Sequence, residues 1–228
     1  MSDNLSWLPF LLQTSDALFP TGAYAHSLGF EECVRLGIVL DEPSLRDFLV
    51  EQLVPAQRQQ ELPWFRFAFE ANDLSGLCAI DREIDAWKLA RETREASIQL
   101  GLRRLKALRI ISDAPDLAEF EQAIAGQGAR GHHLVICALQ ARVENIPLFA
   151  ALTAYFYQSL AAICVTALKL IRIGQEGCQR ALRFAAAQAE ATIRESLHVA
   201  RKNAGWFNPV LEIASMRHAF APERLFIS

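Results

Sequence analysis

Apolar side chains recur every three or four positions along most of this chain, the spacing that places them on one face of an α-helix. Leu74, Leu77, Ile80, Ile84 and Trp87 form one such face. Proline, asparagine and aspartate stand at the breaks between runs, where helices begin and end. The predicted helices cover residues 43–53, 63–69, 74–87, 91–111, 115–126, 134–143, 148–171 and 175–200, with a last short helix from 208. We therefore predict an all-α protein.

Two further features agree with helices. The aromatic run over 64–69 alternates like a strand for a few residues, but its neighbours are helical, so we predict helix there too. Glycine (11) and proline (9) total 20 of 228 residues, a low share that favours helices over turn-rich β structure. Because no repeat, low-complexity stretch or linker divides the chain, residues 1–228 are predicted to form a single-domain multi-helix bundle.

The predicted helix over 148–171 is long and apolar enough to imitate a membrane span. It carries a polar seam, however, because several polar residues share one side of the helix. That stripe consists of Tyr155, Gln158, Ala162, Val165, Lys169 and Arg172. We predict the long central apolar helix of a soluble bundle, with the stripe facing a polar network or a partner. Side chains that reach solvent at a helix end, and a membrane-associated protein, are the alternatives.

The predicted helix over 91–111 carries four basic residues beside its apolar stripe. The stripe consists of Ile98, Leu102, Leu105 and Leu108, and the basic residues are Arg103, Arg104, Lys106 and Arg109. We interpret the basic residues as a solvated face of the helix, with a docking patch as the alternative.

Charge and cysteine usage narrow the class of protein. The chain has 23 Lys and Arg against 26 Asp and Glu, a net charge of −3, which speaks against nucleic-acid binding because phosphate contacts need a basic face. The five cysteines are scattered and form no C-x-x-C pair, as expected of reduced, buried thiols. The first residues are acidic and polar, unlike a signal peptide. We predict a cytoplasmic protein.

No motif predicts catalysis or cofactor binding. Residues 126–131 match the letters G-x-G-x-x-G, but a dinucleotide site needs a strand before that loop, and the pattern here predicts a helix, so we interpret it as an interhelical loop. His132 and His133 are adjacent and point apart on a helix, which favours capping or a local hydrogen bond over metal binding. We predict no catalytic residue, metal or cofactor; a small helical enzyme with an active site in a bundle cavity is the alternative.

Three segments place polar residues in apolar surroundings: 16–27, 170–179 and 214–226. Buried polar groups need partners, so such segments form internal networks or bind another protein. They also carry the most specific pattern in the chain.

These segments resemble the UreF family of urease accessory proteins. Five stretches of the chain correspond, in order, to motifs of the family: L-L-Q-x-S-D-x-x-x-P-T-G-x-x-x-H-S-x-G-x-E over 11–31, R-E-A-S over 94–97 with Gly101, G-H at 131–132, K-L-I-R-I-G-Q-E-G-C-Q over 169–179, and S-M-R-H over 215–218 with R-L-F-I-S over 224–228. The resemblance thus covers nearly the whole chain. It departs at Lys169, where the family has arginine, at Ala219, where glutamate is common, and at His133, where a smaller or apolar residue is usual.

The resemblance implies an all-helical, non-enzymatic chaperone that helps to deliver nickel to urease. Members of this family form a dimer, join a second accessory protein (UreD, also called UreH) and recruit the GTPase UreG, and the assembly then meets apo-urease for GTP-dependent nickel insertion. A partner-binding C-terminal tail is expected from about residue 205. The residues expected to contact partners are Arg217, His218, Arg224, Lys169, Arg172 and Gln175. For Arg224, an arginine-finger role on the nucleotide is the alternative to an interface contact.

Overall fold

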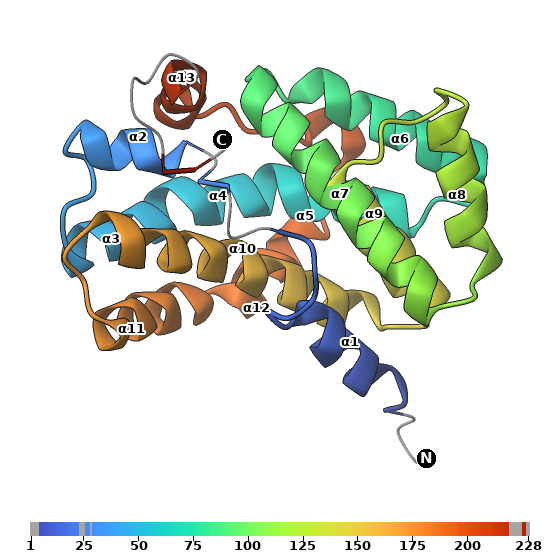
Figure 1. Ribbon diagram of the computed structural model, residues 1–228, viewed down its shortest axis with the longest axis horizontal. Helices are drawn as coiled ribbons and strands as arrows, with labels where there is room; N and C mark the ends of the chain where they lie inside the picture. The colour runs from blue at the N-terminus through green and yellow to red at the C-terminus, as the bar shows by residue number, and fades with distance from the viewer. Residues whose placement is uncertain (1–4, 23–25, 28, 219–224, 227–228) are drawn as a thin grey trace.

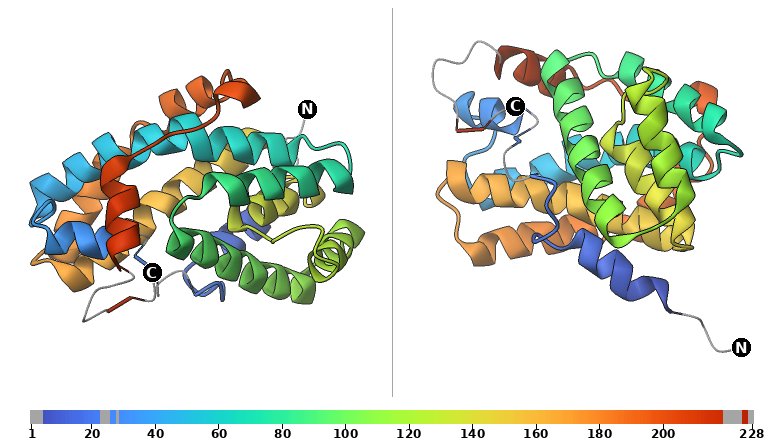
Figure 2. Two further views of the ribbon diagram at one scale, coloured as in Figure 1. Left: turned by 90° about the horizontal axis from the view of Figure 1, so that it is seen from above. Right: turned by 45° about the vertical axis from the view of Figure 1, so that its right-hand side comes forward.

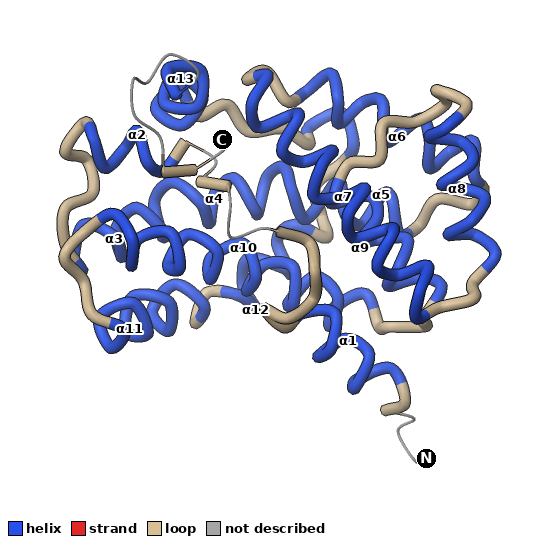
Figure 3. The backbone as a smooth tube through the Cα atoms, in the orientation of Figure 1, coloured by secondary structure: helices blue, strands red, loops and turns tan. Residues whose placement is uncertain are grey.

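The computed structural model describes residues 5–22, 26–27, 29–218 and 225–226, which form helices joined by short loops, with no strand among them (Figures 1 and 3). The predicted all-α architecture is confirmed. The α-helices are α1 (Trp7–Ser15), α2 (Phe30–Arg35), α3 (Glu42–Phe48), α4 (Val54–Ala56), α5 (Leu62–Phe69), α6 (Leu74–Trp87), α7 (Arg91–Ile111), α8 (Pro115–Ala125), α9 (His133–Val143), α10 (Leu148–Leu170), α11 (Gln175–Ala186), α12 (Ala189–Ser196) and α13 (Pro209–His218). Two π-helices, η2 (Leu49–Leu53) and η3 (Gln57–Glu61), and the 3-10 helix η4 (Arg201–Asn203) complete the set.

Local capping explains several helix starts. The Asp41 side chain accepts a hydrogen bond from the Ser44 backbone N–H at 3.0 Å ahead of α3, and the Asp73 side chain accepts one from the Gly76 N–H at 2.7 Å ahead of α6. Proline begins α8 and precedes α10, as predicted. The sequence pattern does not predict α1 or α2, because α1 is apolar on nearly all sides and α2 has only six residues.

One long helical stretch replaces two predicted helices. The predicted helix from Pro63 is α5, with Pro63 in its first turn, but no break precedes it, because the chain stays helical from Glu42 to Phe69 through η2, α4, η3 and α5. A proline inside a helix cannot donate a hydrogen bond to the carbonyl four residues earlier, and its ring clashes with that carbonyl. The wider turns of the π-helices make room for the ring. The carbonyl of Gln59, four residues before Pro63, instead accepts a hydrogen bond from the Gly205 N–H at 2.9 Å. The segment between η4 and α13 is therefore attached to this helical stretch through Gly205.

The predicted long apolar helix is α10, and it lies at the centre of the fold (Figure 1). It packs against α1, α2, α5, α9, α11 and α12. Its inner side buries Leu152, Phe156 and Leu160 completely, while Tyr157 and Val165 on its outer side are exposed. Within the part of the chain that the structure describes, α10 is the one helix long and apolar enough, by length and composition, to cross a membrane. Because α10 packs against six helices, we interpret it as a core helix.

The rotation of α7 about its axis differs from the prediction. Leu102, predicted for the core, is exposed, whereas Arg104, predicted for a solvated face, is buried at 4% exposure. The cause is Gly101, where a Cβ atom would lie 2.0 Å from the Gly131 carbonyl oxygen, so α7 and the start of α9 approach too closely for any side chain there. Facing Gly101 towards α9 also turns Arg104 and Leu108 inward.

The predicted helix over 175–200 is two helices. The backbone N–H of Gln188 bonds to the Ala185 carbonyl at 3.1 Å, three residues back, and this tighter turn separates α11 from α12. The change of direction lets α12 pack on η3 and α10 with Ile193 fully buried. The helix also ends at Ser196 rather than near residue 200.

Candidate functional site

The C-terminal helix α13 packs on α2 (Figure 1). Asn208 fixes its start, because the Asn208 side-chain oxygen accepts hydrogen bonds from the N–H groups of Val210 and Leu211, at 3.1 and 3.2 Å. Gly29, in the left-handed region at φ +87°, lets the two helices approach, since a Cβ atom there would lie 2.5 Å from the Ser215 Oγ. The predicted tail thus begins with an ordered helix.

Two carboxylates at the start of α2 hold the tail, and we call this contact the tail clamp (Glu31, Glu32, Arg217, Phe226 and Lys169). Glu32, 1% exposed, pairs with Arg217 at 3.1 Å. Glu31 accepts the backbone N–H of Leu225 at 2.9 Å and that of Phe226 at 3.4 Å. The buried Phe226 ring lies 5.2 Å from the Lys169 Nζ, a cation–π distance. Two of the predicted partner residues, Arg217 and Lys169, therefore lie in one cluster.

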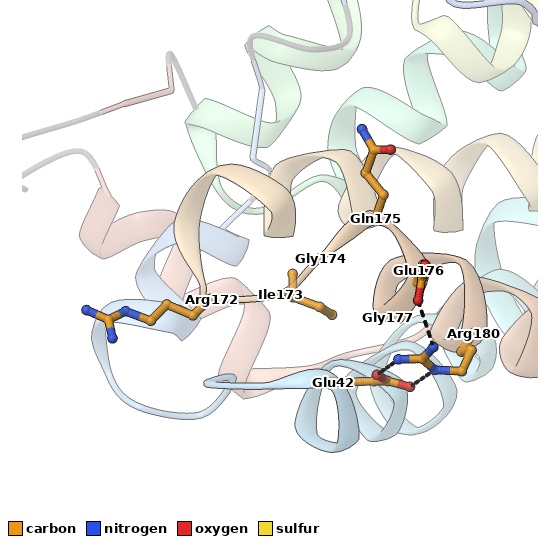
Figure 4. Close-up of a pocket in the computed structure, with 8 residues that line it drawn as sticks. All are labelled: Glu42, Arg172, Ile173, Gly174, Gln175, Glu176, Gly177 and Arg180. Atoms are coloured by element: carbon orange, nitrogen blue, oxygen red, sulfur yellow. Dashed lines mark hydrogen bonds and ion pairs between the residues drawn. The ribbon is translucent and has the colours of Figure 1, made fainter.

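Arg172 and Gln175 flank the break between α10 and α11, at a surface cleft of about 530 Å³ (Figure 4). Both side chains are exposed and point in different directions, away from an ion pair that also lines the cleft. In that ion pair, Arg180 donates to both carboxylate oxygens of Glu42, at 2.8 and 2.7 Å. Of the other predicted residues, Arg224 and the side chain of His218 lie outside the described residues.

An exposed apolar surface adjoins α13, and the sequence prediction missed it. We call it the α13 surface; its members are Trp87, Leu89, Phe207, Val210 and Ile213, each more than 40% exposed. Two contacts bring the two segments that carry these residues together: Gly205 packs against the Trp87 ring, and Glu212 accepts the Ala90 N–H at 3.3 Å. One signal was present: apolar residues occur all round the last helix, more than a single packed face needs.

The predicted polar stripe of α10 is confirmed for Tyr155 and Gln158. The Tyr155 hydroxyl donates to Glu61 at 2.8 Å, and Lys88 donates to the same carboxylate at 3.1 Å. Burial alone would raise the pKa of Glu61, but Lys88 and Tyr155 outweigh it and lower that pKa, whereas burial raises the pKa of Tyr155. Gln158 donates to the Ser15 hydroxyl at 2.8 Å. These contacts fasten α10 to η3 and α1.

A second polar network surrounds Arg104. Its guanidinium donates to the Gln140 side-chain oxygen at 2.9 Å and to the Thr14 carbonyl at 3.2 Å, while the Gln140 amide donates to the Thr14 hydroxyl at 2.7 Å. All three side chains are buried. This network, together with Gln158, positions α1 on the body.

Residues 126–132 form the interhelical loop that was predicted, between α8 and α9. Asp81, fully buried on α6, accepts the backbone N–H groups of Arg130, Gly131 and His132. The His132 ring lies 3.1 Å from the Ser97 hydroxyl and 3.2 Å from an Asp85 oxygen, which confirms the predicted local hydrogen bond. Among the described residues, no three His, Cys, Asp or Glu side chains gather as a metal site would need.

The fold and these surfaces define a class: an all-helical protein whose buried polar groups form internal networks and which exposes apolar residues beside its C-terminal helix. A sequence model of the UreF family matches residues 39–186, and the chain belongs to that family. It is 34% identical over 222 residues to urease accessory protein UreF of Paenarthrobacter aurescens, and 33% over 218 residues to that of an Arthrobacter species, covering 96% of both chains in each case. It is 26% identical to UreF of Haemophilus influenzae over 100% of this chain and 98% of that one.

Family membership supports a role in urease maturation. The relatives are named accessory proteins, not enzymes, which fits the prediction of a non-enzyme better than the alternative of a bundle-cavity enzyme. The five described cysteines are free and buried, so they offer no exposed nucleophile.

Proposed function

We propose that this chain is a cytoplasmic, non-enzymatic scaffold that joins the UreD/UreH accessory protein and recruits the GTPase UreG. The assembly would meet apo-urease, where GTP hydrolysis accompanies the transfer of nickel. In this proposal nickel is the ion that is transferred, not a cofactor of this chain. The identities of the partners are inferred from the family resemblance. The observation that carries the proposal is the ordered tail helix with the α13 surface beside it.

The α13 surface supports a protein contact for a physical reason. Five large apolar side chains that stay exposed on two segments in contact carry a hydration cost that a partner removes, and exposed apolar groups of this kind mark protein interfaces. Two of the members, Trp87 and Phe207, are aromatic, the kind of residue that contributes most to binding free energy at interfaces.

The tail clamp supports a polar rim for the same contact. Arg217 is about half exposed although it pairs with Glu32, so the exposed part of its guanidinium can meet a carboxylate of a partner. Lys169, Arg172 and Gln175 are exposed at the end of α10 and start of α11. His218 and Arg224 remain proposals from sequence and family.

A homodimer within the complex is part of the proposal, and the outer side of α10 supports it. Tyr157, Val165 and Leu168 are 49%, 45% and 38% exposed on the outer side of this apolar helix. A second copy that covers them would explain why so apolar a helix is only partly covered.

The test is a pull-down of tagged protein from cells that hold the whole urease operon. Ile213→Ser and Val210→Ser, both on the α13 surface, should lower recovery of UreD/UreH at least tenfold, with urease activity falling in parallel. Ile110→Ser is the matched control, because Ile110 is 79% exposed at the far end of α7. Thermal unfolding must be unchanged in all three variants. Undiminished recovery of UreD/UreH by both α13 variants would contradict the proposed contact.

A further inference from the structure

The loop that follows α1 is held in one conformation by its own hydrogen bonds. The Asp16 side chain accepts the N–H of Leu18 at 2.8 Å, and the Asp16 carbonyl accepts the N–H of Phe19 at 3.0 Å. The Phe19 carbonyl then accepts the N–H of Thr21 at 2.8 Å. A loop ordered in this way loses little conformational freedom when it meets a partner.

Two arginines of α7 lie against the loop, and the blue loop beside the green α7 can be followed in Figure 2. The Arg104 guanidinium carbon lies 5.2 Å from the centre of the Phe19 ring. Gly22, at φ +74°, lies so close to Arg103 that a Cβ atom would be 2.3 Å from its Nη1. Phe19 is thus turned inward, over Arg104.

Leu18 points the opposite way. It is 91% exposed, more than any other large apolar residue in the described part of the chain. The fold packs Phe19 and leaves the neighbouring leucine in water at the tip of an ordered loop. An apolar side chain presented in this way can enter a pocket of another protein as an anchor.

The exposed charges on the adjoining part of α7 are positive, whereas the loop itself contributes the Asp16 carboxylate that accepts the Leu18 N–H. Arg103 and Lys106 lie three residues apart on α7, so both project from the same side of that helix, and both are exposed. Neither they nor the buried Arg104 form an ion pair with any carboxylate among the described residues, whereas Arg109, further along α7, pairs with Glu121 at 3.6 Å. Even with the Asp16 carboxylate counted, Arg103 and Lys106 leave a net positive charge on this part of α7 and its loop, although the chain is acidic overall.

We propose that Leu18, Arg103 and Lys106 form an interaction surface, the Leu18 surface, for a protein with an acidic contact face that holds an apolar pocket. Leu18 fills the pocket, and the two basic side chains meet carboxylates at its rim. A second copy of this chain is a poor match, because a two-fold contact would bring the basic residues of both copies together. A membrane surface is a poor match as well, since a single leucine gives little insertion.

The Leu18 surface uses residues outside the tail clamp and the α13 surface. The inference rests on the proposed function only for the choice of probes, which are purified UreD/UreH, UreG and apo-urease from the same operon. Each probe is titrated against the full chain. The variants are Leu18→Ser and the double charge reversal Arg103→Glu with Lys106→Glu. The controls are Leu12→Ser, an exposed leucine on α1, and Arg183→Glu with Lys202→Glu, two exposed basic residues elsewhere.

We expect one probe to lose at least tenfold in affinity with Leu18→Ser and with the double reversal, and to keep its affinity with both controls. Binding of that probe to the wild type should weaken as salt rises from about 50 to 300 mM, and the double reversal should flatten this dependence. Circular dichroism and thermal unfolding of the variants should match the wild type, since none of the changed side chains is buried.

Unchanged affinity of all three probes for both Leu18-surface variants would overturn the inference. So would an effect of these variants only on self-association in sedimentation, which would indicate a second copy, or only on binding to vesicles of phosphatidylserine and phosphatidylcholine, which would indicate a membrane. If Ile213→Ser abolishes UreD/UreH binding while the Leu18-surface variants bind every probe normally, the proposed function stands and this inference fails.

Discussion

Asp81 shows how one buried side chain can organise a distant loop. Its carboxylate accepts three backbone N–H groups of residues 130–132, which would otherwise be buried without partners. Asp81→Asn keeps the size of the side chain but turns an N–H₂ group towards these donors. We expect it to lower the free energy of unfolding by about 2–3 kcal/mol, measured by urea unfolding. Asp113→Asn, at an exposed position, should change it by less than about 0.5 kcal/mol, and equal effects of the two would contradict the role of Asp81.

The burial of His133 makes the stability of the folded protein depend on pH and decides whether stability rises or falls with pH. Burial, followed by the charges of Arg104 and Lys88, lowers the pKa of His133 from 6.5 to about 3. The folded state therefore keeps the ring neutral while the unfolded chain binds a proton below pH 6.5, so stability is present above that pH and is lost as the pH falls. The loss attributable to His133 should reach about 2 kcal/mol at pH 5.

The measurement is urea unfolding at pH 7.5 and pH 5 for the wild type and for His133→Gln, which cannot titrate. The difference between the two pH values should shrink by about 2 kcal/mol in the variant. His198→Gln serves as the control for the loss of an imidazole elsewhere in the chain. An undiminished difference in His133→Gln would show that other groups cause the pH dependence.

For Arg224, the sequence and the family resemblance lead to a specific expectation, a contact with UreG. A guanidinium can pair with a carboxylate through two hydrogen bonds, which an ammonium cannot, so Arg224→Ala should cost more UreG recruitment than Arg224→Lys. Recruitment and urease activation are measured beside thermal unfolding. Lost recruitment at unchanged stability supports an interface contact. A parallel loss of stability would mean that Arg224 supports the fold instead.

At the scale of elements, the contact between α7 and α9 depends on a missing side chain. A Cβ atom at Gly101 would lie 2.0 Å from the Gly131 carbonyl oxygen and 2.8 Å from the His133 nitrogen. Both are backbone atoms, so neither can move away without displacing the chain. We expect Gly101→Ala to lower the free energy of unfolding by about 3 kcal/mol. Gly174→Ala is the control, because no atom lies within 4 Å of a Cβ there. Near-wild-type stability of Gly101→Ala would show that the helices can separate at little cost.

The elements also show what the sequence can and cannot predict. Caps such as Asp73 and prolines such as Pro147 act locally, so the pattern predicts those helix starts correctly. The rotation of α7 depends on its approach to Gly131, and the continuous stretch through Pro63 depends on Gly205 as a hydrogen-bond donor. Both causes join residues far apart in the chain, and helical periodicity does not detect them.

The same reasoning applies to the candidate site. Motifs shared with a family indicate Arg217 and Lys169, but their meeting through Glu32 and Phe226 depends on how α13 packs on α2. The α13 surface joins Trp87 to residues more than a hundred positions later, so it exists only in the folded chain. Residue types could be predicted, whereas their grouping required the tertiary structure.

On the scale of the whole molecule, apolar residues stay exposed in separate places: on the α13 surface, on the outer side of α10 and at Leu18. A scaffold that must hold several proteins at once needs such separate surfaces. We expect Val165→Asp, on the outer side of α10, to halve the mass of the complex with UreD/UreH in light scattering, because it places a charge in the proposed dimer contact. Phe184→Asp, at an exposed position on α11, is the control, and an unchanged mass for Val165→Asp would contradict that contact.

The hydrogen bond from the Gly205 N–H to the Gln59 carbonyl has a consequence for experiments in solution. It connects the root of the tail to the helical body through main-chain atoms alone, so its lifetime can be followed by deuterium uptake at a single amide without changing any side chain. Slow uptake at residue 205 would report a tail seated on the body. Faster uptake on addition of a partner would report that the tail lifts from its root, and slower uptake that the partner seals it in place.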